Sequence, residues 1–351
     1  GYLLMGSVPN PLTIYQGVAA LPPATSLEVS SACPDQARAE TYWPLSADEG
    51  EPASTSEAVE RISALLAESV RISLVSDVPL GAFLSGGLDS SIIAAIARQH
   101  MPELHTFSVG IEGSRDLEAA RRVSRHIGSI HHEYVYTVHE VIESLPEIVY
   151  YLESFDRDLV RSAIPTWFCA RLAAQEVKVI LTGEGADELF AGYKYYKDIR
   201  DPQVLHTELR RSVTRLHNIN LQRVDRMTMR HGIEARGPFL DRNVIELGPT
   251  VPTAWKLHDV RGVPVENWIL RKAFEDLLPS AIVWRDKEQF DEGSGMVDLL
   301  HQLIGEVTAG IDAPSYQARH AADRLRSAEE CWYHQLLVDP FDYASPVLAH
   351  V

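Results

Sequence analysis

Cysteine is scarce in this sequence, and long apolar runs are missing from it. The three cysteines, Cys33, Cys169 and Cys331, are widely spaced and odd in number. They fit neither a disulfide framework nor a zinc cluster, so we expect buried free thiols. No apolar stretch approaches the length of a membrane span, and the first residues lack the basic region and apolar block of a signal peptide. These absences predict a cytoplasmic protein with no membrane partner.

Basic residues are also in short supply. The chain has 32 lysines and arginines against 49 aspartates and glutamates, which gives a net charge of −17. Because nucleic-acid surfaces are bound through neutralisation of their phosphates, this balance argues against a nucleic-acid partner. Any bound nucleotide must therefore meet a locally positive site. With 351 residues, 45% of them hydrophobic, the chain has an ordinary globular composition and can bury one large core or two modest ones.

A glycine- and serine-rich motif, SGGLDSS at residues 85–91, is the most informative feature present. It follows a segment typical of a strand and opens a segment typical of a helix. Adjacent glycines let the backbone bend close to an anion, and the first amides of the helix point donors at it. The motif lacks the lysine of the other common phosphate loop. We therefore predict a pyrophosphate cradle in which Asp89 can hold magnesium, whereas a Gly-Gly pair standing alone would indicate only a tight turn.

Strand-like segments alternate with helix-like ones through the next part of the chain. After a helix at residues 57–72, strands are expected at 78–84, 104–109, 133–136 and 177–181, and helices at 90–98, 115–127, 138–152 and 163–174. This order predicts an α/β fold in which helices cover both faces of a parallel sheet. A ligand site is then expected at the carboxyl ends of the strands. The preceding residues look like strands and linker, and residues 204–351 are rich in helical patterns.

A second glycine-containing motif, TGEGADELFAGY at residues 182–193, follows the last of these strands. It should therefore lie at the same edge of the sheet as the first motif. Asp187 is placed to share a magnesium ion with Asp89, and Glu184 can serve as a base or as a substrate anchor. The alternative is a solvated acidic helix N-terminus, where carboxylates are favoured in any case. Two motifs at one edge favour the functional interpretation.

Two further runs, residues 223–241 and residues 284–295, concentrate positive charge. Phosphate transfer needs cations where negative charge grows, and Lys287 beside a glycine-containing loop is suited to that role. For the first run, a network of ion pairs that joins helices is at least as good an explanation as direct catalysis. That network would involve Arg223, Asp225, Arg226 and Glu234.

Motifs in a fixed order extend over nearly the whole chain: SGGLDSS, TFSVG with a downstream Asp116, TGEGADELFAGY, DRMTMRHGIEARGPFLD and WRDKEQF. The series resembles the synthetase domain of glutamine-hydrolysing asparagine synthetase, within the PP-loop ATP pyrophosphatase superfamily. The resemblance implies a parallel five-stranded sheet flanked by helices, of the adenine nucleotide alpha hydrolase-like type, with a helix-rich C-terminal part. It also implies a ligase that uses ATP to activate a carboxylate as an acyl-adenylate, releases pyrophosphate and lets an amine displace AMP.

The expected substrates of such a ligase are small molecules, with aspartate as the acid and ammonia as the amine. Two alternatives remain open. One is an enzyme of secondary metabolism that uses another acid or nitrogen nucleophile. The other is a catalytically weak module that binds a nucleotide.

The same resemblance implies a role for individual residues. Glu184 would deprotonate the incoming amine, and Lys287 would stabilise charge during adenylation and transfer. Asp89 and Asp187 would hold Mg²⁺, and Arg161 would pair with a substrate carboxylate in bidentate geometry. The ATP contacts would come from Leu84 and Val109 at the adenosine, from Ser85, Gly86, Gly87, Asp89 and Ser90 at the pyrophosphate, and from Gly183 on the nucleotide side of the substrate pocket.

The chain also departs from the family pattern. Residues 2–15 look like the last strand and exit segment of a glutaminase domain. We therefore interpret residues 1–52 as the remnant of that domain plus a linker, and residues 53–351 as the synthetase domain. No N-terminal nucleophilic cysteine is present, so we expect ammonia from a separate glutaminase domain or chain, or from another amine source. Asn267 stands where the family usually has lysine, and Gly237 replaces a common valine. A homodimer is compatible with the sequence.

Overall fold

A five-stranded sheet forms the centre of the fold. The computed structural model describes residues 11, 13, 17–45, 50–287, 293–295, 304–305, 307–321 and 323–338. The strand order is β5-β4-β3-β6-β7, and every neighbouring pair is parallel. The strands are β3 (Leu80–Phe83), β4 (His105–Gly110), β5 (Ile130–Val135), β6 (Val179–Leu181) and β7 (Glu234–Arg236). The predicted parallel α/β sheet is therefore confirmed.

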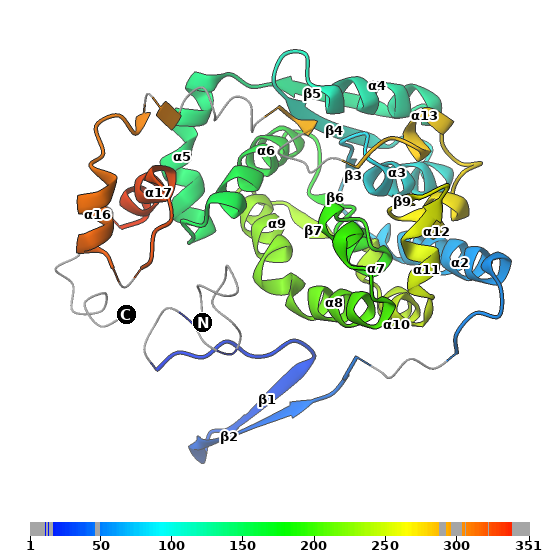
Figure 1. Cartoon of the computed structure of the whole chain (residues 1–351), viewed down its shortest axis with the longest axis horizontal. Helices are drawn as coiled ribbons and strands as arrows, with labels where there is room; N and C mark the ends of the chain where they lie inside the picture. The colour runs from blue at the N-terminus through cyan, green and yellow to red at the C-terminus, as the bar shows by residue number, and fades with distance from the viewer. Residues whose placement is uncertain are drawn as a thin grey trace.

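Helices flank the sheet and make up most of the C-terminal part (Figure 1). In the first part they are α2 (Thr55–Ser73), α3 (Leu88–His100), α4 (Arg115–Ile127), α5 (Val138–Leu152), α6 (Arg157–Ala173) and α7 (Ala186–Phe190). The C-terminal part contributes α8 (Pro202–Arg215), α9 (Asn220–Met229), α10 (Arg242–Thr250), α11 (Thr253–Lys256), α12 (Trp268–Ala273), α13 (Ser280–Val283), α16 (Ala313–Arg319) and α17 (Ala328–Val338). No helix in the described ranges is long and apolar enough to cross a membrane.

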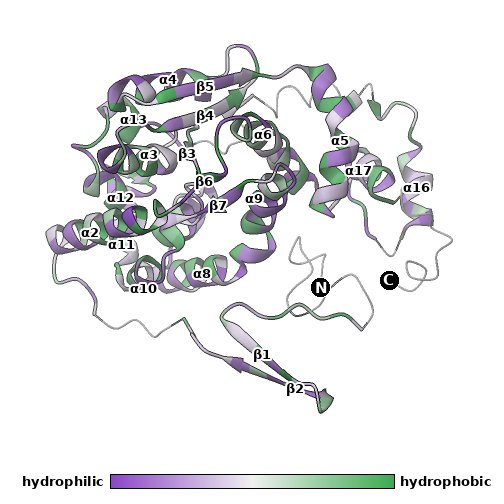
Figure 2. Cartoon of the chain, turned by 180° about the vertical axis from the view of Figure 1, so that it is seen from behind, coloured by the Kyte–Doolittle hydropathy of each residue, from purple (hydrophilic) through white to green (hydrophobic). Residues whose placement is uncertain are grey.

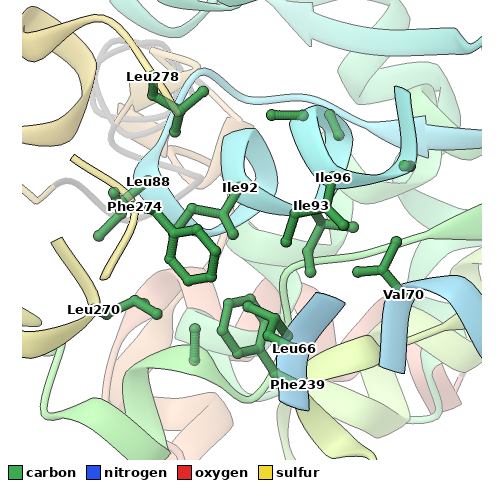
Figure 3. Close-up of a cluster of buried hydrophobic side chains, with 14 of the residues drawn as sticks. Leu66, Val70, Leu88, Ile92, Ile93, Ile96, Phe239, Leu270, Phe274 and Leu278 are labelled. Carbon is green, nitrogen blue, oxygen red and sulfur yellow. The ribbon is translucent and has the colours of Figure 1, made fainter. Parts of the chain in front are cut away.

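The two faces of the sheet bury different hydrophobic cores, because successive strand residues point to opposite sides. Val179 and Leu181 of β6 join a core that includes residues of α2, α3, α10 and α12. Ile180, between them, joins a second core with residues of α5 and α6. Figure 3 shows the first of these cores where α2 and α3 meet the chain around Phe239 and Leu270. Both faces of the sheet are thus covered, as the alternation of strands and helices predicts.

Local signals in the sequence set the ends of several helices. Helix α4 begins after Ser114, whose side chain accepts a hydrogen bond from the Leu117 amide, and it ends at Gly128 with φ of 68°. Helix α5 begins with a capping box between Thr137 and Glu140. Both helices have the predicted bounds.

Other elements differ from the prediction. Helix α6 begins at Arg157 rather than at residue 163, because the Asp156 side chain accepts hydrogen bonds from the amides of residues 158 and 159. Strand β7 lies inside the first charged run, where no strand was predicted from the residue pattern. Its three residues are mostly polar, and its backbone pairs with β6 at the edge of the sheet. Cys33 is exposed rather than buried, whereas Cys169 and Cys331 are buried free thiols as expected.

An antiparallel hairpin precedes the sheet, formed by β1 (Thr25–Ser30) and β2 (Cys33–Thr41). It projects from the body of the molecule (Figures 1 and 2). It agrees with the expected strands before residue 53. Apart from residues 11 and 13, the predicted exit segment at residues 2–15 lies outside the described residues. The proposed division at residue 52 stays a prediction.

The buried core predicts a clear contrast between two isoleucines. Ile92 of α3 is fully buried, whereas Ile72 of α2 is 49% exposed. We expect Ile92→Ala to lower the free energy of unfolding by about 2–5 kcal/mol, because it removes buried methyl groups and leaves a cavity. Ile72→Ala should change it by about 0.5 kcal/mol or less. Urea denaturation measures both, and equal effects would contradict the assignment of these faces.

Candidate active site

A cavity of about 970 Å³ lies at the carboxyl ends of β3, β4 and β6. Small-molecule sites commonly enclose about 300–1,000 Å³, so it is large enough for a nucleotide-sized ligand. Most of the predicted site residues line it: Leu84, Ser85, Gly87, Asp89, Ser90, Gly183, Glu184, Asp187 and Lys287. Gly86, Val109 and Arg161 are not among its lining residues.

The SGGLDSS loop joins β3 to the N-terminus of α3. The hydroxyls of Ser85 and Ser90 lie 3.1 Å apart, and the Gly87 amide donates to the Ser85 hydroxyl at 3.3 Å. Gly86 has φ of +73°, and a Cβ there would lie 2.5 Å from the Ala120 amide nitrogen. Gly86 therefore packs the loop against α4, while Gly87 and the serines face the cavity with the first turn of α3.

The TGEGADELFAGY loop follows β6 and touches the first loop. A Cβ on Gly183 would lie 2.9 Å from the Ser90 amide nitrogen and 3.0 Å from the Asp89 Cβ, so only glycine fits here. Gly185 has φ of +99°, which reverses the chain into the short helix α7. This close approach brings the carboxylates of both loops to one place.

Lys287 lies between the carboxylates of the two loops. Its Nζ is 2.7 Å from Asp89 Oδ2 and 2.8 Å from Asp187 Oδ2. Burial tends to lower the pKa of Lys287, but the two carboxylates outweigh it and hold that pKa above its ordinary value. Burial raises the pKa of Asp89 to about 6, although Lys287 opposes this shift. The lysine is therefore charged and neutralises two acids that would otherwise repel each other.

The oxygen atoms of this cluster fit a magnesium ion. Among the described residues, Asp89 Oδ1 is buried without a hydrogen-bond partner. Such an orphaned carboxylate oxygen is costly unless something charged binds it. Asp187 supplies a second carboxylate beside it, and oxygen ligands are those that magnesium prefers.

Glu184 forms an ion pair on the same wall of the cavity. Its Oε1 lies 2.5 Å from Arg223 Nη2, and the two side chains are 20% and 8% exposed. Burial raises the pKa of Glu184, and the Arg223 guanidinium opposes that rise. Arg226, one turn along α9, pairs with Glu153 at 2.8 Å. The first charged run thus forms ion pairs, and both arginines also line the cavity.

A buried scaffold that the sequence analysis missed supports Lys287. Arg271 pairs with Glu266 at 2.8 Å and donates to the backbone carbonyls of Val283 and Arg285. The Lys287 amide in turn donates to Glu266 Oε1 at 3.3 Å. No motif signals these contacts, because the partners lie up to 21 positions apart in the helical C-terminal part.

Arg285 is a second residue that the sequence analysis missed. It lies 2.8 Å from Asp116 and donates to the Gly86 carbonyl at 3.4 Å, so it joins three of the ordered motifs. Its position two residues before Lys287 in the WRDKEQF motif was the available signal.

Arg161 and Asn267 have other surroundings than the sequence suggests. Arg161 makes two hydrogen bonds, of 2.8 and 2.7 Å, to the Glu329 carboxylate between α6 and α17, and the structure does not bring it to the cavity. Asn267 is fully buried, and its Nδ2 donates to Asp187 Oδ1 at 3.2 Å. Asn267, which stands where the family usually has a lysine, therefore contacts Asp187 in the cluster around Lys287. Gly237 lies against Leu240, where an added Cβ would be 3.2 Å from Cδ1.

The chain is similar in sequence to known proteins. The family described as asparagine synthase matches residues 61–204 and 197–335. Asparagine synthetase B [glutamine-hydrolyzing] of Escherichia coli K12 is 34% identical over 297 residues, which cover 80% of this chain and 53% of that protein. Asparagine synthetase [glutamine-hydrolyzing] 2 of Oryza sativa subsp. japonica is 39% identical over 237 residues, 63% of this chain and 40% of that protein. The chain spans about half the length of the curated relatives it matches.

The lysine between the two carboxylates predicts a stability effect that depends on pH. Lys287→Met leaves Asp89 and Asp187 without their cation, so we expect the free energy of unfolding to fall by about 3–5 kcal/mol at pH 8. The loss should shrink at pH 5.5. An acid whose pKa is raised in the folded state begins to destabilise that state above its unfolded pKa, and the full penalty is reached above the raised value. The pKa of Asp89 is about 6 with Lys287 in place, and loss of the lysine raises it further. The two proteins therefore differ in the ionisation of Asp89 only above about pH 6.

Lys272→Met is the matched control, because Lys272 pairs with Glu275 at the surface with both side chains more than a third exposed. Removing such a pair should cost about 1 kcal/mol or less at either pH. Chemical denaturation of both variants at the two pH values makes the comparison. A pH-independent loss for Lys287→Met would contradict the buried charge arrangement.

Proposed function

Because this chain belongs to the asparagine synthase family, we propose that it is a cytoplasmic, ATP-dependent ligase that converts aspartate to asparagine and forms AMP and pyrophosphate. The observation that carries the proposal is the convergence of two glycine loops on Asp89, Asp187 and Lys287 in one cavity. A site for a large anion needs backbone amides, a cation and carboxylates that can hold a metal, and this cavity offers all three.

ATP is the substrate that we assign to the first loop. The amides at the start of α3 and the hydroxyls of Ser85 and Ser90 bind its pyrophosphate, since they face the cavity from a helix N-terminus. Asp89 and Asp187 hold Mg²⁺, which when bound neutralises charge on the phosphate oxygens. Leu84, at the end of β3, contacts the adenosine.

Lys287 stabilises the charge that grows at the α-phosphorus during the first step. An oxygen of the aspartate side-chain carboxylate attacks this phosphorus, and the bond to the departing pyrophosphate breaks. The ammonium group of Lys287 lies within 2.8 Å of both carboxylates. It is therefore within reach of phosphate oxygens bound beside them and supports the five-coordinate transition state.

Glu184 acts in the second step. Ammonia attacks the acyl carbon, the bond from that carbon to the AMP oxygen breaks, and Glu184 accepts the proton that nitrogen releases. An amine is inert while protonated, so a base at this position accelerates transfer. Arg223 orients Glu184 and, by opposing the effect of burial on its pKa, keeps a larger fraction of it ionised.

Ammonia is the nitrogen source that we assign to the cavity. The relatives named above are glutamine-hydrolysing synthetases. We propose that the same cavity receives ammonia released from glutamine, whether by a domain of the same protein or by a partner. Added ammonium salts should replace that supply in a test of the chain alone.

Substitution of Glu184 separates the two steps. We expect Glu184→Gln to retain aspartate-dependent exchange of labelled pyrophosphate into ATP, because adenylation does not use this base. Asparagine formation from ammonium should fall about 10²- to 10⁴-fold. Glu275→Gln, which alters an exposed ion pair, is the control and should leave both rates unchanged. Equal loss of exchange and transfer in Glu184→Gln would rule out a role confined to transfer.

The pH dependence of transfer provides a second test. Burial raises the pKa of Glu184 above its ordinary value of 4.5. At a constant concentration of free ammonia, the ratio of transfer to exchange should therefore fall as the pH drops through that raised pKa and the base becomes protonated. Arg223→Met removes the opposing cation, so the acidic limb should move to higher pH. Taking the ratio removes the titration of Asp89, which affects both steps. If the acidic side of this pH profile lies at the same pH in Arg223→Met as in the wild type, Arg223 does not keep Glu184 ionised.

A further inference from the structure

A second cluster of titratable side chains lies outside the lining of the cavity, where α16 and α17 meet. Figures 1 and 2 show these two helices side by side at one end of the molecule, next to α5. The cluster consists of His320, which ends α16, Asp323 in the following turn, and His334 on α17. The function proposed above uses none of these residues.

The nitrogen and oxygen atoms of the cluster have the spacing of metal ligands. His334 Nε2 is 3.3 Å from Asp323 Oδ2, His320 Nδ1 is 3.6 Å from the same oxygen, and all three ligand atoms lie within 4.8 Å of one another. In tetrahedral zinc sites, bonds of about 2.0–2.2 Å place neighbouring ligand atoms about 3.3–3.6 Å apart. Two of the three separations thus match a zinc site.

Tyr316 provides the outer contact that metal-binding histidines usually have. Its hydroxyl lies 2.9 Å from His334 Nδ1, and its ring lies 4.4 Å from that of His320, measured between ring centroids. Because Tyr316 bonds to Nδ1, Nε2 of His334 is directed at Asp323. Metal-binding histidines commonly have such a second hydrogen-bond partner, which fixes the orientation of the ring. His334 is only 2% exposed, so its orientation is held by packing as well.

The side chains of His320 and Asp323 are 20% and 26% exposed, which leaves a path for an ion to enter.

We propose that His320, Asp323 and His334 bind a divalent transition-metal ion, with Zn²⁺ the ion that two imidazoles and one carboxylate suit best. The fourth position of the ion is completed by water or by another group of the protein. The ion ties α16 and the following turn to α17. Because Glu329 of α17 pairs with Arg161 of α6 at 2.7 Å, the site stabilises the packing of the C-terminal helices against the nucleotide domain.

Metal content measures the proposal directly. The chelator-treated chain is equilibrated with ZnCl₂, freed of unbound metal by gel filtration and analysed for zinc. We expect one ion per chain in the wild-type protein and its loss in Asp323→Asn and His320→Gln, with both variants folded by circular dichroism. His139→Gln is the control, because His139 pairs only with Glu143 in the described part of the chain and is 81% exposed. This variant should keep its zinc, and retention of zinc in Asp323→Asn would overturn the proposal.

Two further readouts identify the ligands. CoCl₂ in place of zinc should give the visible bands of a tetrahedral nitrogen and oxygen site, whereas an intense sulfur charge-transfer band would assign the metal to a cysteine and overturn the proposal.

Tyr316→Phe removes the contact to Nδ1 of His334 and should weaken zinc binding about 10- to 100-fold. Zinc should raise the melting temperature of the wild-type chain but not that of Asp323→Asn, and an equal rise in both would count against a site made by Asp323.

Discussion

The ion cluster of Lys287 with Asp89 and Asp187 is the interaction on which the candidate active site depends. It joins three segments that together span nearly 200 residues of the chain, since Lys287 and Asp89 are 198 positions apart. Without a cation, two buried carboxylates on adjoining loops would repel each other and one would take up a proton. The buried Arg271–Glu266 pair extends this arrangement, because it holds the backbone that carries the lysine. Stability and the proposed chemistry therefore rest on the same charges.

The sheet topology explains why the loops meet where they do. Strand β3 has β4 on one side and β6 on the other, so connections from this point run in opposite directions across the sheet. A crevice forms at such a switch point, outside the carboxyl ends of the strands. The SGGLDSS loop follows β3 and the TGEGADELFAGY loop follows β6. The absence of a side chain at Gly183 lets the second loop approach the first closely enough to share a ligand.

Sequence reasoning succeeded where a feature depends on neighbouring residues. The caps at Ser114 and Thr137 specify the starts of α4 and α5, and the glycine loops identify the edge of the sheet. It failed where long-range packing decides the outcome. Strand β7 is short and polar, so only its pairing with β6 makes it a strand. Arg161 carries the charge expected of a substrate contact, but its partner Glu329 is 168 positions away and no local pattern announces it.

The central claim is that a carboxylate oxygen attacks the α-phosphorus of ATP in this cavity. It is tested most directly with aspartate carrying oxygen-18 in its side-chain carboxylate, incubated with the chain, ATP, Mg²⁺ and ammonium. If the acid is adenylated and ammonia then displaces AMP, one labelled oxygen leaves with the nucleotide, and mass spectrometry finds the label in AMP. Label in inorganic phosphate together with ADP would show attack at the γ-phosphorus and would contradict the account.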